Sequence, residues 1–345
     1  NPVMQYQSEE IGNDDSTGLH TVTISQQFVT ANKLGIAQQV QSREYQKQLS
    51  RLRIEELRVM ARVRTAFALG LVAQNRVDLT ETIFDLARQT ESGVNDLVEA
   101  EEASRLALLQ AKVETEQAKI NYENARSQYQ ATIRSLSAAV GDSTIAVSRL
   151  VGELPDPSND RPWDSMLESL AASSPEMSLA GSELERAKWA LQLACARVVP
   201  NVTGQAGVGY DAVSDDTFAL IGVSVPQPIR NRNQGNIRSA RADITGAAAA
   251  IDETRLSIEG RLARSVGQYE ISRERYWRLT DSVIPAAEEA YELAKKAFEV
   301  GEADYLLLLT TQRTLFEKRL VALEALGQVT IASNEIDTLL VTLPF

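Results

Sequence analysis

The side chains most often used in catalysis and metal binding are scarce in this sequence. It contains one cysteine, Cys195, and one histidine, His20, far apart in the chain. One thiol and one imidazole cannot build a zinc site or a Cys–His catalytic pair, and a single cysteine rules out a disulfide within the chain. We expect Cys195 to be a small core residue of a helix and His20 to lie at the edge of a strand or turn.

Neighbouring carboxylates are the other candidates for acid–base chemistry. They occur as Asp14-Asp15, Glu101-Glu102 and Asp215-Asp216. All three pairs fall in expected turns or helix ends, where solvation explains them. The sequence has no GxSxG, P-loop or HExxH pattern, and the glycines from Gly204 to Gly209 have strand spacing. We therefore expect no enzyme, no cofactor and no metal site.

Composition narrows the class of protein further. The 345 residues include 47 acidic and 35 basic ones, which gives a net charge of −12. Such a chain repels nucleic acid, and no basic stripe that could bind phosphates stands out. The negative charge suits the passage of cations or, more simply, solubility. Apolar residues at 43% with only 6% aromatics indicate long packed helices. No apolar run reaches the ~20 residues of a membrane-spanning helix.

Two separate matches reveal an internal repeat. EAEEASRLALLQAKVE from Glu99 aligns without a gap with EVGEADYLLLLTTQRT from Glu299, at an offset of 200. VTISQQFVTANKLGI from Val22 aligns with VSVPQPIRNRNQGNI from Val223, at an offset of 201. The nearly equal offsets predict two copies of one structural unit. We place the first copy at 1–140, a linker at 141–174 and the second copy at 175–345.

The second copy predicts a helix, two strands and two more helices. The apolar spacing and the prolines give the bounds 175–198 for the first helix, 201–210 and 218–225 for the strands, 233–300 for a very long helix interrupted only by Pro285, and about 303–340 for a shorter helix after Gly301. Strand residues of the expected sheet include Val202, Val208, Tyr210, Phe218 and Leu220.

The first copy follows the same plan, with strands at 4–7 and 21–28 and helices at about 33–98 and 103–140. Helices of 65 to 70 residues would be rods of roughly 100 Å. The half-helix before the first hairpin is missing, and at the observed offset it would lie upstream of Asn1, so we expect the N-terminus to be processed or truncated. Two hairpins supply too few strands to close a barrel, so several protomers should contribute strands to one barrel.

The sequence resembles the TolC-type outer membrane efflux proteins over essentially its whole length. Three stretches carry the resemblance: SPEMSLAGSELERAKWALQLACARVVPNVTGQAGVGY from Ser174, VSVPQPIRNRNQGNI from Val223 and FEVGEADYLLLLTTQ from Phe298. The opening NPVMQYQSEEIGN is similar to the Asn-Pro start of the heavy-metal, CzcC-like branch.

This resemblance implies a homotrimer with a twelve-stranded barrel in outer-membrane lipid and an α-helical tunnel across the periplasm. The fold class is then mainly α with a small β part, and 141–174 becomes an equatorial segment around the tunnel. An inner-membrane pump and a periplasmic adaptor would feed this passive duct. The transported substrate, whether metal ions, drugs or proteins, stays open.

The resemblance also implies that the helix tips meet the adaptor. The matching residues are Val300, Gly301 and Glu302, with Ala100 and Glu101 in the first copy. The simpler alternative is an ordinary helix–turn–helix in which Gly301 ends a helix.

Drug-pumping members of the family narrow the tunnel with acidic rings just past the tip glycine. Here that stretch is Leu306 to Leu309, so an acidic ring has to come from Glu302 and Asp304, with Arg105 as a counter-charge. The alternatives are ordinary helix-end charges or an apolar plug that includes Leu306 and Leu307.

A structural protein is the rival to a duct. Long helices rich in Ala and Glu also occur in soluble or membrane-associated bundles and coiled coils. The proline-bounded strands at 201–210 and 218–225 argue against that alternative.

Overall fold

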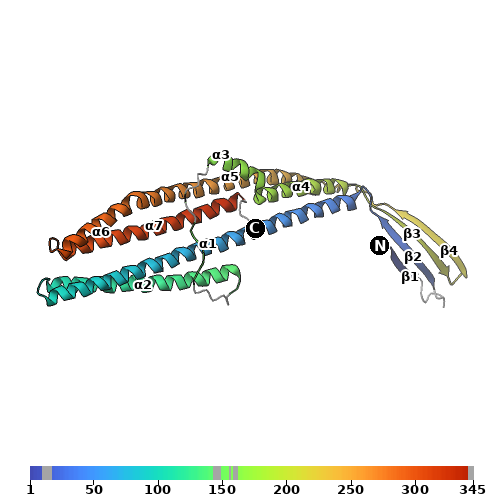
Figure 1. Ribbon diagram of the computed structural model, residues 1–345. Coiled ribbons are helices and arrows are strands. Elements are labelled where there is room, and N and C mark those ends of the chain that lie inside the picture. Colours follow the sequence, from blue (N-terminus) through green and yellow to red (C-terminus); the bar gives the residue numbers. More distant parts are fainter. Residues whose placement is uncertain (10–17, 143–148, 155–156, 158–161, 341–345) are drawn as a thin grey trace. The chain divides into compact units, whose positions relative to one another are not determined.

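The computed structural model describes residues 1–9, 18–142, 149–154, 157 and 162–340 (Figure 1). The Asp14-Asp15 pair lies outside these residues. The strands are β1 (Val3–Glu9), β2 (Leu19–Phe28), β3 (Val202–Asp211) and β4 (Asp216–Ser224). The helices are α1 (Lys33–Glu99), α2 (Arg105–Val140), α3 (Trp163–Ser173), α4 (Pro175–Ala196), α5 (Gln234–Arg278), a π-helical segment (Leu279–Val283), α6 (Ile284–Glu299) and α7 (Tyr305–Leu339).

The chain forms two compact units, each built from two stretches of sequence. The sheet unit comprises Asn1–Leu52 and Pro175–Arg255, and the tip unit comprises Arg53–Ser174 and Leu256–Phe345. Each unit draws on both expected copies, so compactness does not follow the repeat. Two strands, a long helical stretch and a shorter helix nevertheless follow one another twice, as β1, β2, α1 and α2 and then as β3, β4, α5 to α6, and α7. In the described part of the chain, no helix has the length and apolar character needed to cross a membrane.

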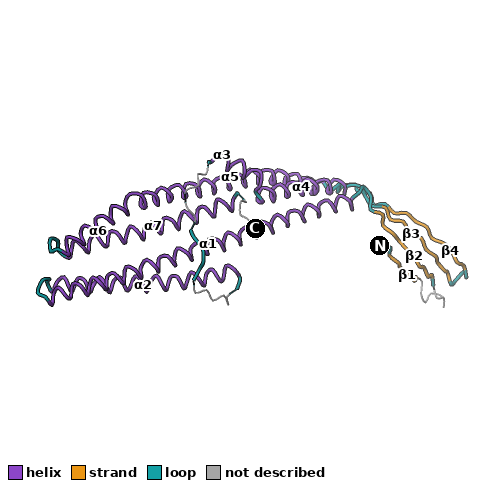
Figure 2. Tube along the Cα trace, viewed as in Figure 1, coloured by secondary structure: helices purple, strands orange, loops and turns teal. Residues whose placement is uncertain are grey.

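The sheet has two chemically different faces. Its strands pair antiparallel in the order β1-β2-β3-β4 (Figure 2). Side chains alternate along a strand and paired residues share a face, so the register sorts them. One face is mostly apolar and carries Met4, Tyr6, Val22, Ile24, Phe28, Val202, Ala206, Val208, Tyr210, Ala219, Ile221 and Val223, with Ser8, His20, Gln26 and Thr217 as its polar members. The other is mostly polar and carries Gln5, Gln7, Thr21, Thr23, Ser25, Gln27, Thr203 and Gln205, with Val3, Leu19, Phe218 and Leu220 as its apolar members.

Polar contacts join the two hairpins where they meet the helices. The Thr30 hydroxyl donates to the Pro200 carbonyl at 2.6 Å, and the Lys33 ammonium donates to the Val199 carbonyl and to Asn201 Oδ1, each at 2.5 Å. Lys33 thereby satisfies a carbonyl just past the end of α4, where helices leave such groups unpaired. These bonds link segments about 170 residues apart in sequence.

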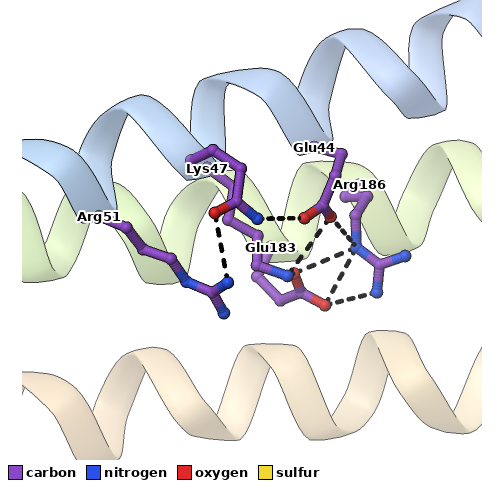
Figure 3. A network of polar contacts seen from close by, with 6 residues as sticks. Glu44, Lys47, Arg51, Glu183 and Arg186 are labelled. Carbon is purple, nitrogen blue, oxygen red and sulfur yellow. Dashed lines mark hydrogen bonds and ion pairs between the residues drawn. The ribbon is translucent and has the colours of Figure 1, made fainter.

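A network of four charged side chains joins α1 to α4 in the sheet unit (Figure 3). Lys47 lies 3.4 Å from Glu44 and 2.8 Å from Glu183, and Arg186 lies 2.5 Å from Glu183 and 3.5 Å from Glu44. Hydrogen bonding to Arg186 lowers the pKa of Glu183 to about 2, and Lys47 adds to this effect. The pKa of Glu44 is also lowered, mainly by its hydrogen bond with Gln48.

In the tip unit, α1 and α2 form one antiparallel hairpin and α6 and α7 form another (Figure 1). Residues 149–154, which we call the strap, lie against the first hairpin. Buried Gln74 of α1 accepts from the Leu150 N–H at 2.8 Å and donates to its carbonyl at 3.3 Å. Leu150 packs with Leu71 and Leu136, beside an apolar cavity of about 480 Å³.

One sequence-based expectation is refined by the structure and one was wrong. The long helix is interrupted by the π-helical segment, which ends two residues before Pro285. Pro285 itself lies in the first turn of α6. A proline lacks an N–H and crowds the preceding turn, and a local widening of the helix relieves that conflict. Cys195 is exposed rather than in the core, because the buried face of α4 runs through its neighbour Ala194.

Candidate functional site at the helix tips

The two tips have the same backbone at the offset that the repeat predicts. Glu101 (φ 62°) and Gly301 (φ 75°) both adopt the left-handed conformation. The Glu102 N–H donates to the Leu97 carbonyl at 2.8 Å, and the Glu302 N–H donates to Ala297 at 2.8 Å. This is the helix-ending pattern that usually takes glycine. The first tip reaches it with a glutamate, which costs about 1–2 kcal/mol of backbone strain.

The helix that follows each tip is capped by a side chain. Ser104 accepts from the Ala107 N–H at 3.2 Å, and Asp304 Oδ1 accepts from the Leu307 N–H at 3.0 Å. Asp304 therefore has a structural role whether or not it also lines a gate. Glu302 is exposed. Arg105 is exposed as well, and no ion pair within the described part of the chain joins it to Glu302 or Asp304.

Apolar packing holds the two tips of one chain together. Buried Tyr305 and Leu309 of α7 cluster with Val94 of α1 and Ala111 of α2. The Phe298 ring meets the Tyr305 ring edge-on, with centroids 6.2 Å apart. Burial, with a smaller effect of Glu114, raises the pKa of Tyr305 to about 12, so its hydroxyl stays neutral.

A charged pair lies next to this cluster. Arg313 of α7 donates to Glu114 of α2 through Nε at 2.8 Å and also through Nη2. The same hydrogen bonds raise the pKa of Arg313. Sequence analysis did not select Tyr305, Glu114 or Arg313. They lie inside the aligned stretch of the repeat, where the two copies have different residues at these positions. That difference could have drawn attention to them.

The tips present apolar side chains to solvent. Val300 is 70% exposed, and Leu306 and Leu307 are 54% and 49% exposed. Leu308 and Leu309 are buried, so the four consecutive leucines divide into an inner and an outer pair. In the first turns of α2, Leu106, Leu109 and Val113 are exposed as well.

The expected strand residues all lie in the sheet but on both of its faces. Val202, Val208 and Tyr210 belong to the apolar face, whereas Phe218 and Leu220 belong to the polar one. Among the described residues, no group of three or more His, Cys, Asp or Glu side chains could hold a metal ion.

Comparison with known proteins decides the family. Residues 166–341 match the family model of the outer membrane efflux protein. A second finding agrees, because the chain is 31% identical to the cobalt-zinc-cadmium resistance protein CzcC of Cupriavidus metallidurans over 285 residues, which is 82% of this chain and 67% of that protein. The chain belongs to the outer membrane efflux protein family.

A second relative and a solved structure support the same family and fold. The nickel-cobalt-cadmium resistance protein NccC of Alcaligenes xylosoxydans xylosoxydans is 25% identical to this chain over 277 residues. The matched region covers 78% of this chain and 61% of NccC. The crystal structure of CusC superposes with a TM-score of 0.82 at 15% identity, over 99% of this chain and 82% of CusC. The fold is therefore that of an outer-membrane efflux channel. Members of this family are passive ducts, not enzymes, that extend from the outer membrane into the periplasm. The rival coiled-coil or bundle protein is not favoured.

Proposed function

We propose that three copies of this efflux protein assemble into one duct. Three four-stranded sheets would close a twelve-stranded barrel, and the long helices would continue it as a tunnel. The exposed apolar face of the sheet supports this proposal, because lipid is the solvent that such a face suits. The unpaired outer edges of β1 and β4 support it too, since closure between protomers would pair them.

We further propose that the helix tips dock a periplasmic adaptor fed by an inner-membrane pump. The contact residues would be Val300, Gly301 and Glu302, with Ala100 and Glu101 in the first tip. The matching left-handed turns at Glu101 and Gly301 and the exposed side chain of Val300 support a contact surface there.

Divalent heavy-metal cations are the cargo that we propose. The observation that carries this proposal is the 31% identity to a cobalt-zinc-cadmium resistance protein over 82% of the chain. The net charge of −12 is compatible with it, because an acidic protein attracts cations rather than repelling them. The duct would discriminate little by itself and would release what its pump delivers.

Metal retention in cells tests this function. A strain that lacks the gene should accumulate more Co²⁺, Zn²⁺ or Cd²⁺ than the parent, measured by mass spectrometry of washed cells. The full-length gene should restore export, and a copy without the second tip, 297–307, should not. Equal metal content in parent and deletion strains, with a changed tolerance of organic drugs instead, would assign the duct to another cargo.

A further inference from the structure

Acidic side chains are absent from the strands β2 to β4 near the helices and from the segments that connect these strands to the helices. No Asp or Glu occurs in residues 16–43, 186–210 or 217–242, although the chain has 47 acidic residues. Basic residues continue through the same stretches. Five exposed arginines lie there, which we call the arginine collar: Arg197, Arg230, Arg232, Arg238 and Arg241. The net charge of −12 for the whole chain conceals this local excess of positive charge.

The collar lies where strands give way to helices. Thr203 of β3 pairs with Ser224 of β4, so the linkers to α4 and α5 leave the sheet side by side. Arg197 is six residues before Thr203, and Arg230 is six residues after Ser224.

Two further arginines extend the collar onto the first turns of α5. Arg238 and Arg241 are three residues apart, which places them on the same face of that helix. All five arginines belong to the sheet unit.

The collar is continuous with the apolar face of the sheet. Ile221 and Val223 of β4 are 88% and 73% exposed, and Ile229, directly before Arg230, is 82% exposed. An apolar surface bordered by cations matches the boundary between the acyl chains and the phosphate groups of a membrane leaflet. Acidic residues lie instead toward the opposite end of the sheet, at Asp211, Asp215 and Asp216.

The arginine side chains are available for a ligand. In the described part of the chain, no ion pair or side-chain hydrogen bond engages any of the five guanidinium groups. The loop that carries two of them is nevertheless ordered by its own bonds. The Arg232 N–H donates to Gln234 Oε1 at 2.7 Å, and the Asn233 N–H donates to Asn231 Oδ1 at 3.0 Å.

We propose that the arginine collar binds the phosphate groups of anionic phospholipids in the leaflet that faces the periplasm. One guanidinium group can donate two parallel N–H hydrogen bonds to the oxygens of a phosphate. The collar would thereby set the depth of the sheet in the membrane and the level at which the helices leave it. This inference rests on the proposed membrane insertion of the sheet.

Lipid competition tests the proposal. The full-length protein is reconstituted into nanodiscs of phosphatidylcholine with a minor fraction of phosphatidylglycerol, and native mass spectrometry counts the retained lipids. We expect enrichment of phosphatidylglycerol over its bulk fraction. Each arginine should contribute about fivefold to the affinity for phosphatidylglycerol, so replacing Arg230, Arg232 and Arg238 by Gln should bring the retained lipids close to their bulk ratio. The control replaces three exposed cations of α2, Lys112, Lys119 and Arg134, by Gln and should leave the enrichment unchanged.

A salt titration of the wild-type protein gives a second readout that needs no variant. The enrichment should fall as NaCl is raised, because salt screens exposed charges. A trimer that inserts normally but holds both lipids in their bulk ratio would overturn the collar proposal alone. So would an equal loss of enrichment in the collar and control variants. Failure to insert into either lipid would overturn the proposed function together with this inference.

Discussion

Single backbone angles at the tips already constrain function. Gly301 and Glu101 have nearly the same φ, yet only glycine adopts it without strain. The first tip therefore carries backbone strain at Glu101, whereas the second tip has a glycine at the equivalent position and no strain. Such a cost persists when the side chain has a use of its own, and an exposed carboxylate at a docking surface would be such a use.

Replacing Gly301 by Pro tests the second tip. Proline cannot adopt a positive φ and removes the N–H that donates to the Phe298 carbonyl at 3.1 Å. We expect export to be abolished while trimers still form on native gels. The matched change Glu101→Gly relieves strain and keeps the left-handed turn, so any loss of export in this variant would come from the missing carboxylate. Normal metal export by Gly301→Pro would show that this tip is not the docking site.

The acidic-gate hypothesis is separable from helix capping at Asp304. Asn caps a helix as well as Asp does, so Asp304→Asn combined with Glu302→Gln removes charge while preserving the bond to the Leu307 N–H. Three copies of each carboxylate around a tunnel axis would attract cations, so the double variant should lower cation selectivity in planar-bilayer recordings. Removing Arg105 should raise open-state conductance. If neither property changes, exposed Leu306 and Leu307 form the constriction instead.

At the scale of elements, the charged network between α1 and α4 should stabilise their contact. Glu183 has a pKa of about 2 in the folded protein, so its contribution is present above its ordinary pKa of 4.5 and is lost as pH falls from there toward 2. Because its side chain is 32% exposed, we expect only about 1 kcal/mol.

Thermal unfolding in detergent, followed by circular dichroism, measures this contribution. Glu183→Gln should lower the midpoint at pH 7, and the difference from wild type should disappear near pH 2. Glu185→Gln is the control, because the Glu185 ion pair with Lys188 stays within α4. Equal shifts in both variants would mean that the cross-helix pairs contribute nothing of their own.

The strap depends on one buried amide. Gln74→Leu removes both bonds to the Leu150 backbone and leaves two buried polar groups unpaired, which costs about 1–3 kcal/mol for each group. We expect trypsin to cut after Arg149 much faster in this variant. Tyr129→Phe removes only the hydroxyl that donates to Gln74 at 3.1 Å and should resist cleavage like the wild type. Unchanged cleavage of Gln74→Leu would assign strap stability to the apolar packing of Leu150.

The elements differ in how far sequence predicts them. Long helices and proline-bounded strands leave periodic patterns, and the bounds of α1 and α2 agree with expectation to within two residues. The strap leaves no such pattern in the sequence. It is held by the Gln74 side-chain amide, which bonds to backbone 76 residues away, and a contact of this kind has no periodic signature. Helix α3 was also missed. The faces of Phe218 and Leu220 needed the strand register, which only the pairing of all four strands provides.

At the scale of the whole molecule, the repeat explains why two hairpins and two tips occur in one chain. The internal offset brings equivalent left-handed turns to residues 101 and 301, and the two hairpins pair through β2 and β3 into a single sheet. One chain still leaves a mostly apolar sheet face and two strand edges exposed, so a closed duct requires the assembly of several chains.

The mass of the native particle tests that step most directly. Full-length protein extracted from the outer-membrane fraction in mild detergent should have the mass of three chains by native mass spectrometry. A monomer recovered from the soluble periplasmic fraction would contradict the assignment of this chain as the protomer of a trimeric outer-membrane duct.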